Sequence, residues 1–209
     1  MKAPFFSNTS DGTHCFQAAL SIVFGSIWPD RKFSIEELDR ISAKMSGKWT
    51  WPTAAMLWMM EQGLEIRLVE DFDYEDFADR GEKYLYDRLG DEVARAQIEN
   101  SEIDQELAFA KRFAKLAPLE CRIPNFKDIE KLLSEGFLII CNINAAALFG
   151  QKGYSGHFIV VYECDKTTLT IHDPGLPPKP SLKVDKKAFE RAWAYPTERE
   201  KNLLAIRAR

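Results

Sequence analysis

Cys15 is the residue of this sequence with the clearest potential for chemistry. A polar, turn-prone run over residues 7–12 precedes it, and an apolar segment without proline, residues 16–27, follows it. The apolar segment predicts a buried helix with Cys15 in its first turn. Unpaired backbone N–H groups and the helix dipole favour a thiolate there, so Cys15 would be a nucleophile near neutral pH. The alternative is a small, buried, inert cysteine.

A thiol nucleophile needs a base, and the sequence contains three histidines. His157 opens an apolar strand directly after a glycine-rich loop, where rigid structure would fix an accessible side chain. Residues 168–172 alternate as the next strand, and a turn at residues 165–167 predicts an antiparallel hairpin. Asp173 follows this second strand, so the hairpin brings its carboxylate beside His157. We therefore expect a triad in which Asp173 orients the imidazole and the imidazole activates Cys15.

Two other uses of these residues remain open. One is a metal site made by Cys15, His157 and either His172 or Asp173, although the chain lacks the closely spaced ligand pairs typical of such sites. The other is a binding module without catalysis, because a fold does not fix a function. We predict no metal and no other cofactor. The remaining cysteines are expected to be structural, since they have no evident base.

The other elements that must position the site follow from capping signals and periodicity. Ser34 caps a helix that ends before Gly47, and Pro52 opens one that ends at Gly63. The sequence further predicts a helix over residues 125–136 and a last helix over 184–194. Strands are expected at residues 65–69, at 137–144 as a central strand buried on both faces, and at 202–206 as an edge strand.

Residues 70–117 differ from the rest because charged side chains dominate them. We expect two amphipathic helices with a break near Gly90 or residues 100–101. These helices form either a solvated subdomain or a lid or partner-binding arm over the site. The whole chain, residues 1–209, is predicted to be a single domain with residues 70–117 as a helical insertion.

Composition excludes several classes of protein. The net charge of −4 and the lack of a basic stretch argue against binding nucleic acid. No apolar run is long enough for a membrane span, and no signal peptide is visible. The four widely spaced cysteines suggest reduced thiols, so a cytoplasmic location is expected. The oligomeric state stays open.

Taken together, three motifs resemble a known family. Residues 11–15 carry a cysteine at a helix start, residues 155–161 carry Gly-His before a buried strand, and residues 171–175 carry Asp-Pro after the next strand. Their order looks like the peptidase C39-like branch of the papain-like cysteine proteases. The resemblance implies an α+β fold in which an N-terminal helical half with the nucleophile helix packs on an antiparallel sheet. It also implies a peptide or protein substrate whose amide bond is attacked through an acyl-enzyme.

One departure from the family pattern concerns the oxyanion. The family places a glutamine six residues before the cysteine, where this chain has Thr9, and the neighbouring Asn8 carries an amide that could donate instead. The function expected is therefore a cysteine peptidase-like hydrolase, with a weak or inactive binding module or an acyl or amide transferase as alternatives. Trp49 and Trp51 are candidates for a substrate cleft, or they are core residues.

Overall fold

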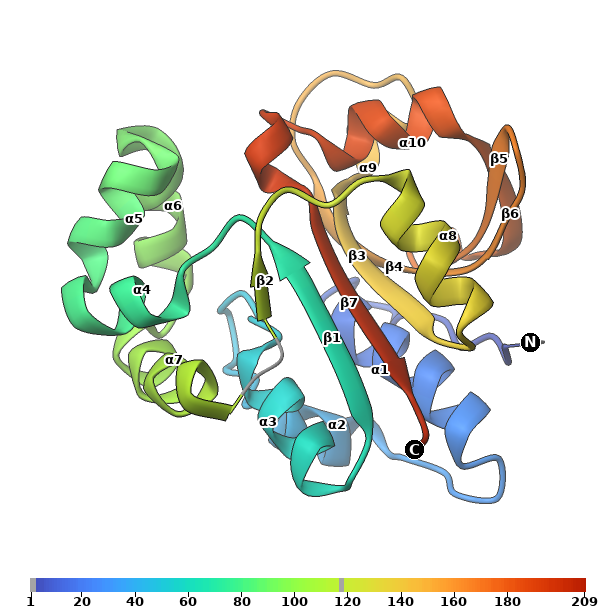
Figure 1. Ribbon diagram of the computed structural model, residues 1–209, viewed down its shortest axis with the longest axis horizontal. Helices are drawn as coiled ribbons and strands as arrows, with labels where there is room; N and C mark the ends of the chain where they lie inside the picture. Colours follow the sequence, from blue (N-terminus) through green and yellow to red (C-terminus); the bar gives the residue numbers. More distant parts are fainter. Residues whose placement is uncertain (1–2, 117–118) are drawn as a thin grey trace.

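One sheet organises the computed structural model, which describes residues 3–116 and 119–209. Seven strands in these residues have the order β2-β1-β7-β3-β4-β5-β6 (Figure 1). The β1–β2 pair is parallel and the other neighbouring pairs are antiparallel, so the predicted α+β class is confirmed. The strands are β1 (Glu65–Glu70), β2 (Leu119–Cys121), β3 (Leu138–Asn144), β4 (Gly156–Cys164), β5 (Thr168–Asp173), β6 (Lys179–Asp185) and β7 (Asn202–Arg207).

Helices cover both faces of this sheet. One core contains α1 (Cys15–Ile27), α2 (Ile35–Ile41) and α3 (Thr53–Glu61), and the other contains α8 (Phe126–Ser134), α9 (Ala145–Leu148) and α10 (Lys186–Trp193). Figure 1 shows α8 and α10 in front of the sheet and α1 behind it. Strand β3 supplies both cores, because Ile140 faces the first while Ile139 and Cys141 face the second. The prediction that this strand is buried on both sides is confirmed.

The nucleophile helix forms where the sequence predicts it. Helix α1 begins at Cys15, and the backbone N–H of Ala18 donates to the carbonyl of His14 at 2.9 Å. Phe16 packs against Phe158 of β4 with ring centroids 4.7 Å apart. This contact joins the start of α1 to the start of β4 and so fixes the two elements that carry Cys15 and His157.

The predicted β4–β5 hairpin is also confirmed. Val160 pairs with His172 in an antiparallel register. The Asp165 carboxylate accepts hydrogen bonds from the backbone N–H groups of Thr167 and Thr168 at 2.8 and 2.7 Å, which closes the turn. An aspartate at this position of a turn replaces backbone partners that the turn cannot supply. The hairpin therefore returns the chain to the end of the sheet where β4 began.

The predictions for the C-terminal part need three corrections. The strand predicted at an edge, residues 202–206, is central and lies between β1 and β3, because its apolar residues alternate between the two cores. Residues 179–185 form strand β6, which was not predicted because the prolines in and before this segment argue against a strand. An edge strand tolerates Pro180, and β6 pairs with β5 alone. The start of the glycine-rich loop predicted before His157 is instead the short helix α9.

The charged segment contains four short helices where two were predicted. They are α4 (Tyr74–Arg80), α5 (Glu82–Leu89), α6 (Asp91–Asn100) and α7 (Ile103–Leu116). Gly81 and Gly90 end the first two with positive φ angles of 57° and 78°, conformations that glycine adopts without a steric penalty. The helices lie beside the β2 end of the sheet (Figure 1). That they are an insertion within a single domain stays a prediction.

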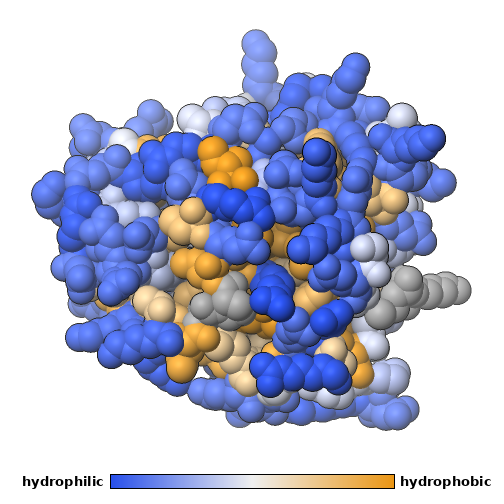
Figure 2. All heavy atoms as spheres, viewed as in Figure 1, coloured by the Kyte–Doolittle hydropathy of each residue, from blue (hydrophilic) through white to orange (hydrophobic). Residues whose placement is uncertain are grey.

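The face of the molecule seen in Figure 2 carries mostly hydrophilic side chains, with hydrophobic atoms gathered near its middle. Among the helices of residues 3–116 and 119–209, none has the combined length and hydrophobicity of a membrane span. The cytoplasmic location stays a prediction.

Candidate active site

The folded chain brings Cys15, His157 and Asp173 together. Cys15 opens α1, His157 is the second residue of β4, and Asp173 is the last residue of β5. His157 Nε2 lies 2.7 Å from Asp173 Oδ1. The His157 side chain and the backbone groups of Phe16 and Phe158 lie close enough to the Cys15 sulfur to lower the pKa of its thiol. The first turn of α1 thus supplies a backbone group that favours the thiolate, as the sequence suggested.

The electrostatics of this group favour an ion pair. Burial raises the pKa of the Cys15 thiol, but the hydrogen bond and the charge of His157 outweigh it and leave that pKa below its ordinary value of 9.0. Burial lowers the pKa of His157, whereas hydrogen bonds to Asp173 and Cys15 raise it, with a net pKa of about 9. Each partner therefore stabilises the charged form of the other, which favours a thiolate–imidazolium pair.

The carboxylate of Asp173 is held firmly. Its side chain is buried, and its Oδ1 accepts a second hydrogen bond from the Gly175 N–H at 2.8 Å. Although burial raises the pKa of Asp173, the bonds to His157 and Gly175 keep it below the ordinary value. A Cβ at Gly175 would lie 2.8 Å from Asp173 Oδ1 and 3.1 Å from His157 Nε2, so any side chain there would force these groups to shift.

Asn142 positions the backbone of the histidine, which sequence reasoning missed. Its Oδ1 accepts a hydrogen bond from the His157 N–H at 3.1 Å. The side chain of Asn202 in turn bonds both backbone groups of Asn142, its Oδ1 accepting from the N–H at 2.7 Å and its Nδ2 donating to the carbonyl at 2.9 Å. The signal that could have identified Asn142 is a polar residue inside an otherwise apolar strand, since a buried polar group needs a partner.

The loop before α1 holds Asn8 against the turn that follows Asp173. The Asn8 N–H donates to the Pro174 carbonyl at 2.8 Å. Its side-chain Oδ1 accepts from the N–H groups of Thr9 and His14 at 2.9 and 2.8 Å. With Oδ1 bound in this way, the Nδ2 group of Asn8 has no hydrogen-bond partner among residues 3–116 and 119–209. The amide is therefore fixed in orientation, with two free donor hydrogens.

Thr9 has a different environment from Asn8. Its hydroxyl Oγ1 lies 2.6 Å from Asp11 Oδ1 and 2.8 Å from His14 Nδ1. The other nitrogen of His14 lies 3.4 Å from a carboxylate oxygen of Asp39. The Thr9 hydroxyl is therefore bonded within the loop, and its side chain stabilises the turn that precedes Cys15.

The two tryptophans predicted as cleft residues have different surroundings. Trp51 stacks on Phe77 with ring centroids 5.5 Å apart, and its Nε1–H donates to Ser101 Oγ at 2.9 Å. It therefore joins the α4–α7 segment to the first core. Trp49 is 45% exposed, and its backbone N–H donates to the carbonyl of Asn100 at 2.6 Å. A cleft role for Trp49 stays a prediction.

His172 lies outside the triad. Its Nε2–H donates to the carbonyl of Ala3, and its Nδ1 accepts from the Ser181 N–H, both at 3.0 Å. Both ring nitrogens are thus used within the protein, and neither is available to a metal shared with Cys15. Over the described part of the chain, no three His, Cys, Asp or Glu side chains are grouped as a metal site requires.

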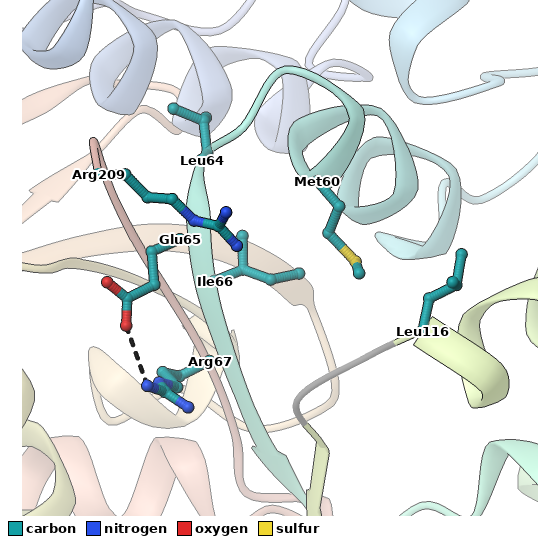
Figure 3. Close-up of a pocket in the computed structure, with 7 residues that line it drawn as sticks. All are labelled: Met60, Leu64, Glu65, Ile66, Arg67, Leu116 and Arg209. Atoms are coloured by element: carbon teal, nitrogen blue, oxygen red, sulfur yellow. Dashed lines mark hydrogen bonds and ion pairs between the residues drawn. The ribbon is translucent and has the colours of Figure 1, made fainter.

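A pocket of about 580 Å³ lies away from these residues, between α3, β1 and α7 (Figure 3). Its apolar surface comes from Met60, Leu64, Ile66 and Leu116, and none of its lining residues belongs to the triad. The chemistry of the chain therefore does not coincide with this cavity.

Comparison with known proteins bears on this geometry. The model of the Peptidase C39 family matches residues 127–197, a segment that contains His157 and Asp173 but not Cys15. The crystal structure of the peptidase domain of Streptococcus ComA, a bi-functional ABC transporter involved in a quorum sensing pathway, matches with a TM-score of 0.52. Its sequence identity to this chain is 14%, and 100% of each chain is covered. This chain resembles the peptidase C39 family.

At 14% identity the structural likeness establishes a shared fold, so the predicted C39-like α+β architecture is confirmed. The family match and the shared C39-like fold support a cysteine peptidase-like function. No curated protein sequence matches the chain at comparable significance. The roles of Cys15, His157 and Asp173 are therefore argued from their own geometry.

Proposed function

We propose that this protein is a cysteine peptidase that cleaves an amide bond of a peptide or protein through Cys15, His157 and Asp173. The observation that carries the proposal is the 2.7 Å contact between His157 and Asp173 beside a Cys15 whose thiol pKa the same His157 lowers. These contacts join an orienting carboxylate, a base and a nucleophile, which is the arrangement that covalent catalysis by a thiol requires. The three residues come from separate elements, so the fold has to assemble them.

The reaction follows from the ion pair. The Cys15 thiolate attacks the carbonyl carbon, and the carbonyl π electrons move to oxygen to give a tetrahedral oxyanion. The His157 imidazolium then donates its proton to the leaving amine as the C–N bond breaks, which leaves a thioester on Cys15. Neutral His157 next removes a proton from water, the hydroxide attacks the thioester, and Cys15 departs as a thiolate while His157 is again protonated. Asp173 remains ionised and keeps Nε2–H of the ring in place.

The oxyanion requires donors that are already in position, and Asn8 fits this role better than Thr9. Its amide is fixed by two backbone bonds with Nδ2 unoccupied, whereas the Thr9 hydroxyl is bound to Asp11 and His14. We assign the Asn8 Nδ2 and the Cys15 backbone N–H as the pair of donors. Asn8 would then replace the glutamine of the family pattern from a position one residue earlier.

The test is the alkylation rate of each cysteine against pH, measured by peptide mass, in the wild-type protein and in His157→Ala. Cys121 provides an internal reference because it is exposed to the reagent. Partial desolvation of its thiol and nearby carboxylates raise its pKa, so it is not an activated thiol. We expect Cys15 to react far faster than Cys121 below pH 7, and His157→Ala to abolish the difference. Hydrolysis of a panel of fluorogenic peptide amides by the same proteins, with Cys15→Ala as the inactive control, then connects the reactivity to function.

Three outcomes distinguish the alternatives. A reactive Cys15 with amide turnover that Cys15→Ala abolishes supports the peptidase. A reactive Cys15 whose acyl group passes to an added amine in preference to water indicates a transferase on the same site. An unreactive Cys15 in both proteins overturns the catalytic assignment and favours a binding module.

A further inference from the structure

A lysine adjoins the oxygen of Asp173 that faces away from the histidine. Oδ1 of Asp173 is bonded to His157 and to the Gly175 N–H, whereas the Nζ of Lys179 lies 3.5 Å from Oδ2. Asp173 and Lys179 are paired residues in the β5–β6 register, directly after the irregularity that interrupts this pairing. The sheet itself therefore sets the lysine opposite the triad carboxylate.

Two further contacts hold the ammonium group of Lys179 in this position. It lies 3.3 Å from the Pro177 carbonyl oxygen and 4.2 Å from the ring centroid of Phe149. An ammonium over an aromatic face is attracted by the ring quadrupole. The Lys179 side chain is 32% exposed, compared with 3% for the side chain of Asp173. The carboxylate is thus buried between an imidazole on one side and a partly exposed ammonium on the other.

We propose that Lys179 is a positioning residue for the triad, which fixes the Asp173 carboxylate and offsets part of its negative charge. As a result, the Cys15–His157 ion pair exists over a lower pH range than it would without the lysine. This inference rests on the proposed peptidase function. A carboxylate alone would bind the imidazolium more tightly and make it a weaker acid, whereas proton donation to the leaving amine requires an acid near neutral pH.

The largest charge effects on Asp173 come from His157 and Lys179, and the largest on His157 come from Cys15 and Asp173. His172 precedes Asp173 in β5, but its ring is bound to Ala3 and Ser181, and burial keeps its pKa low, so it is neutral.

The sign of the effect follows directly. Removal of a positive charge disfavours loss of a proton from every neighbouring acid. Without Lys179, the thiol of Cys15 and the imidazolium of His157 both lose their protons at higher pH. Both limbs of the pH profile should therefore move to higher pH, by about half a pH unit, the size expected for one partly screened charge beyond the first contact shell.

The experiment measures two pH profiles, Cys15 alkylation and peptide amide hydrolysis, in the wild type, Lys179→Met, Lys179→Gln and Lys179→Arg. The matched control is Lys183→Met, which removes an exposed lysine from the same strand. Thermal melting checks that each variant is folded. We expect both limbs of each profile to shift to higher pH in Lys179→Met and Lys179→Gln. They should stay at the wild-type pH in the Lys183→Met control and in Lys179→Arg, which keeps the positive charge.

Each result decides a separate question. If wild-type Cys15 has no enhanced reactivity below pH 7, the proposed function fails and Lys179 has no triad to tune. If Cys15 is reactive but the neutral variants keep both limbs at the wild-type pH, the role of Lys179 is overturned, even if the rate falls. A role confined to holding the strand would lower the rate or the melting temperature without moving either limb.

Discussion

Replacement of Gly175 by alanine tests the triad through sterics alone, because it adds one methyl group and removes no functional group. The new Cβ would lie 2.8 Å from Asp173 Oδ1, where ordinary van der Waals contacts begin at 3.4 Å. Relief of this clash requires a movement of about 0.6 Å, and the groups nearest to the new methyl are the carboxylate and the imidazole themselves. The catalytic pair therefore has to separate or shift.

The size of the effect follows from the bond that is strained. If the carboxylate moves by the full amount, the 2.7 Å contact between His157 Nε2 and Asp173 Oδ1 lengthens to beyond about 3.2 Å, outside the usual range. Hydrogen bonds to charged groups contribute about 1.5–3 kcal/mol, so we expect kcat/KM to fall by roughly 10- to 100-fold. The pKa of His157 should fall as well, because the bond to Asp173 raises it.

The assay compares kcat/KM and the basic limb of the pH profile in Gly175→Ala with those of Gly63→Ala. Gly63 has a φ of +77°, and no other group lies within 4 Å of the place that an added methyl would take. Alanine there costs about 1–2 kcal/mol of stability without touching the site. A Gly175→Ala protein that melts like Gly63→Ala yet retains wild-type activity and pH profile would refute the reasoning. That result would mean that the Asp173 contact is not needed for catalysis.

Three more predictions concern the oxyanion donor Asn8, the orienting carboxylate of Asp173 and the buried Glu106 of α7. Asn8→Ala should lower kcat by about 100- to 1,000-fold with little change in KM, which steady-state kinetics would measure, since the donor acts on the transition state. Asp173→Asn should reduce activity less than His157→Ala does, because it orients the proton carrier; equal losses in the two variants would contradict this. Glu106 of α7 is buried with Oε2 unpaired within the described chain, and burial raises its pKa to about 7. The folded protein thus holds a proton that the unfolded chain releases near pH 4.5, so stability falls as pH rises from about 4.5 to 7, by up to about 3 kcal/mol. Glu106→Gln should stabilise the protein at pH 8 and flatten this slope, as urea unfolding at several pH values would show.

The elements that carry the triad could be predicted from sequence because each has a local signal. A run of polar residues before an apolar segment indicates the start of α1, and Asp165 in a short turn indicates the β4–β5 hairpin. Once a hairpin is assumed, the distance along each strand brings His157 and Asp173 to the same end. The order of these elements along the chain was therefore sufficient to predict that Cys15, His157 and Asp173 lie close together, without knowledge of the complete sheet.

Lateral order in the sheet has no comparable local signal. Residues 202–206 have the pattern of a strand, but nothing in their sequence says that β1 and β3 lie on either side. Those partners are about 140 and 60 residues away along the chain, respectively. The position of Lys179 could not be predicted either, because the neighbouring prolines argued against a strand at residues 179–185. Its contact with Asp173 depends on the β5–β6 register and not on spacing.

The residues that support the triad were missed for the same reason. Gly175 has the sequence signal of a turn residue, yet its backbone N–H and its missing side chain both serve the carboxylate of Asp173. Asn142 looks like an interruption of an apolar strand, yet its Oδ1 holds the His157 backbone. A triad can be proposed from three reactive residue types, whereas its supporting contacts are made largely through backbone groups, which every residue carries. These contacts become visible only when the register of each strand is known, and the Gly175 and Lys179 variants test two of them directly.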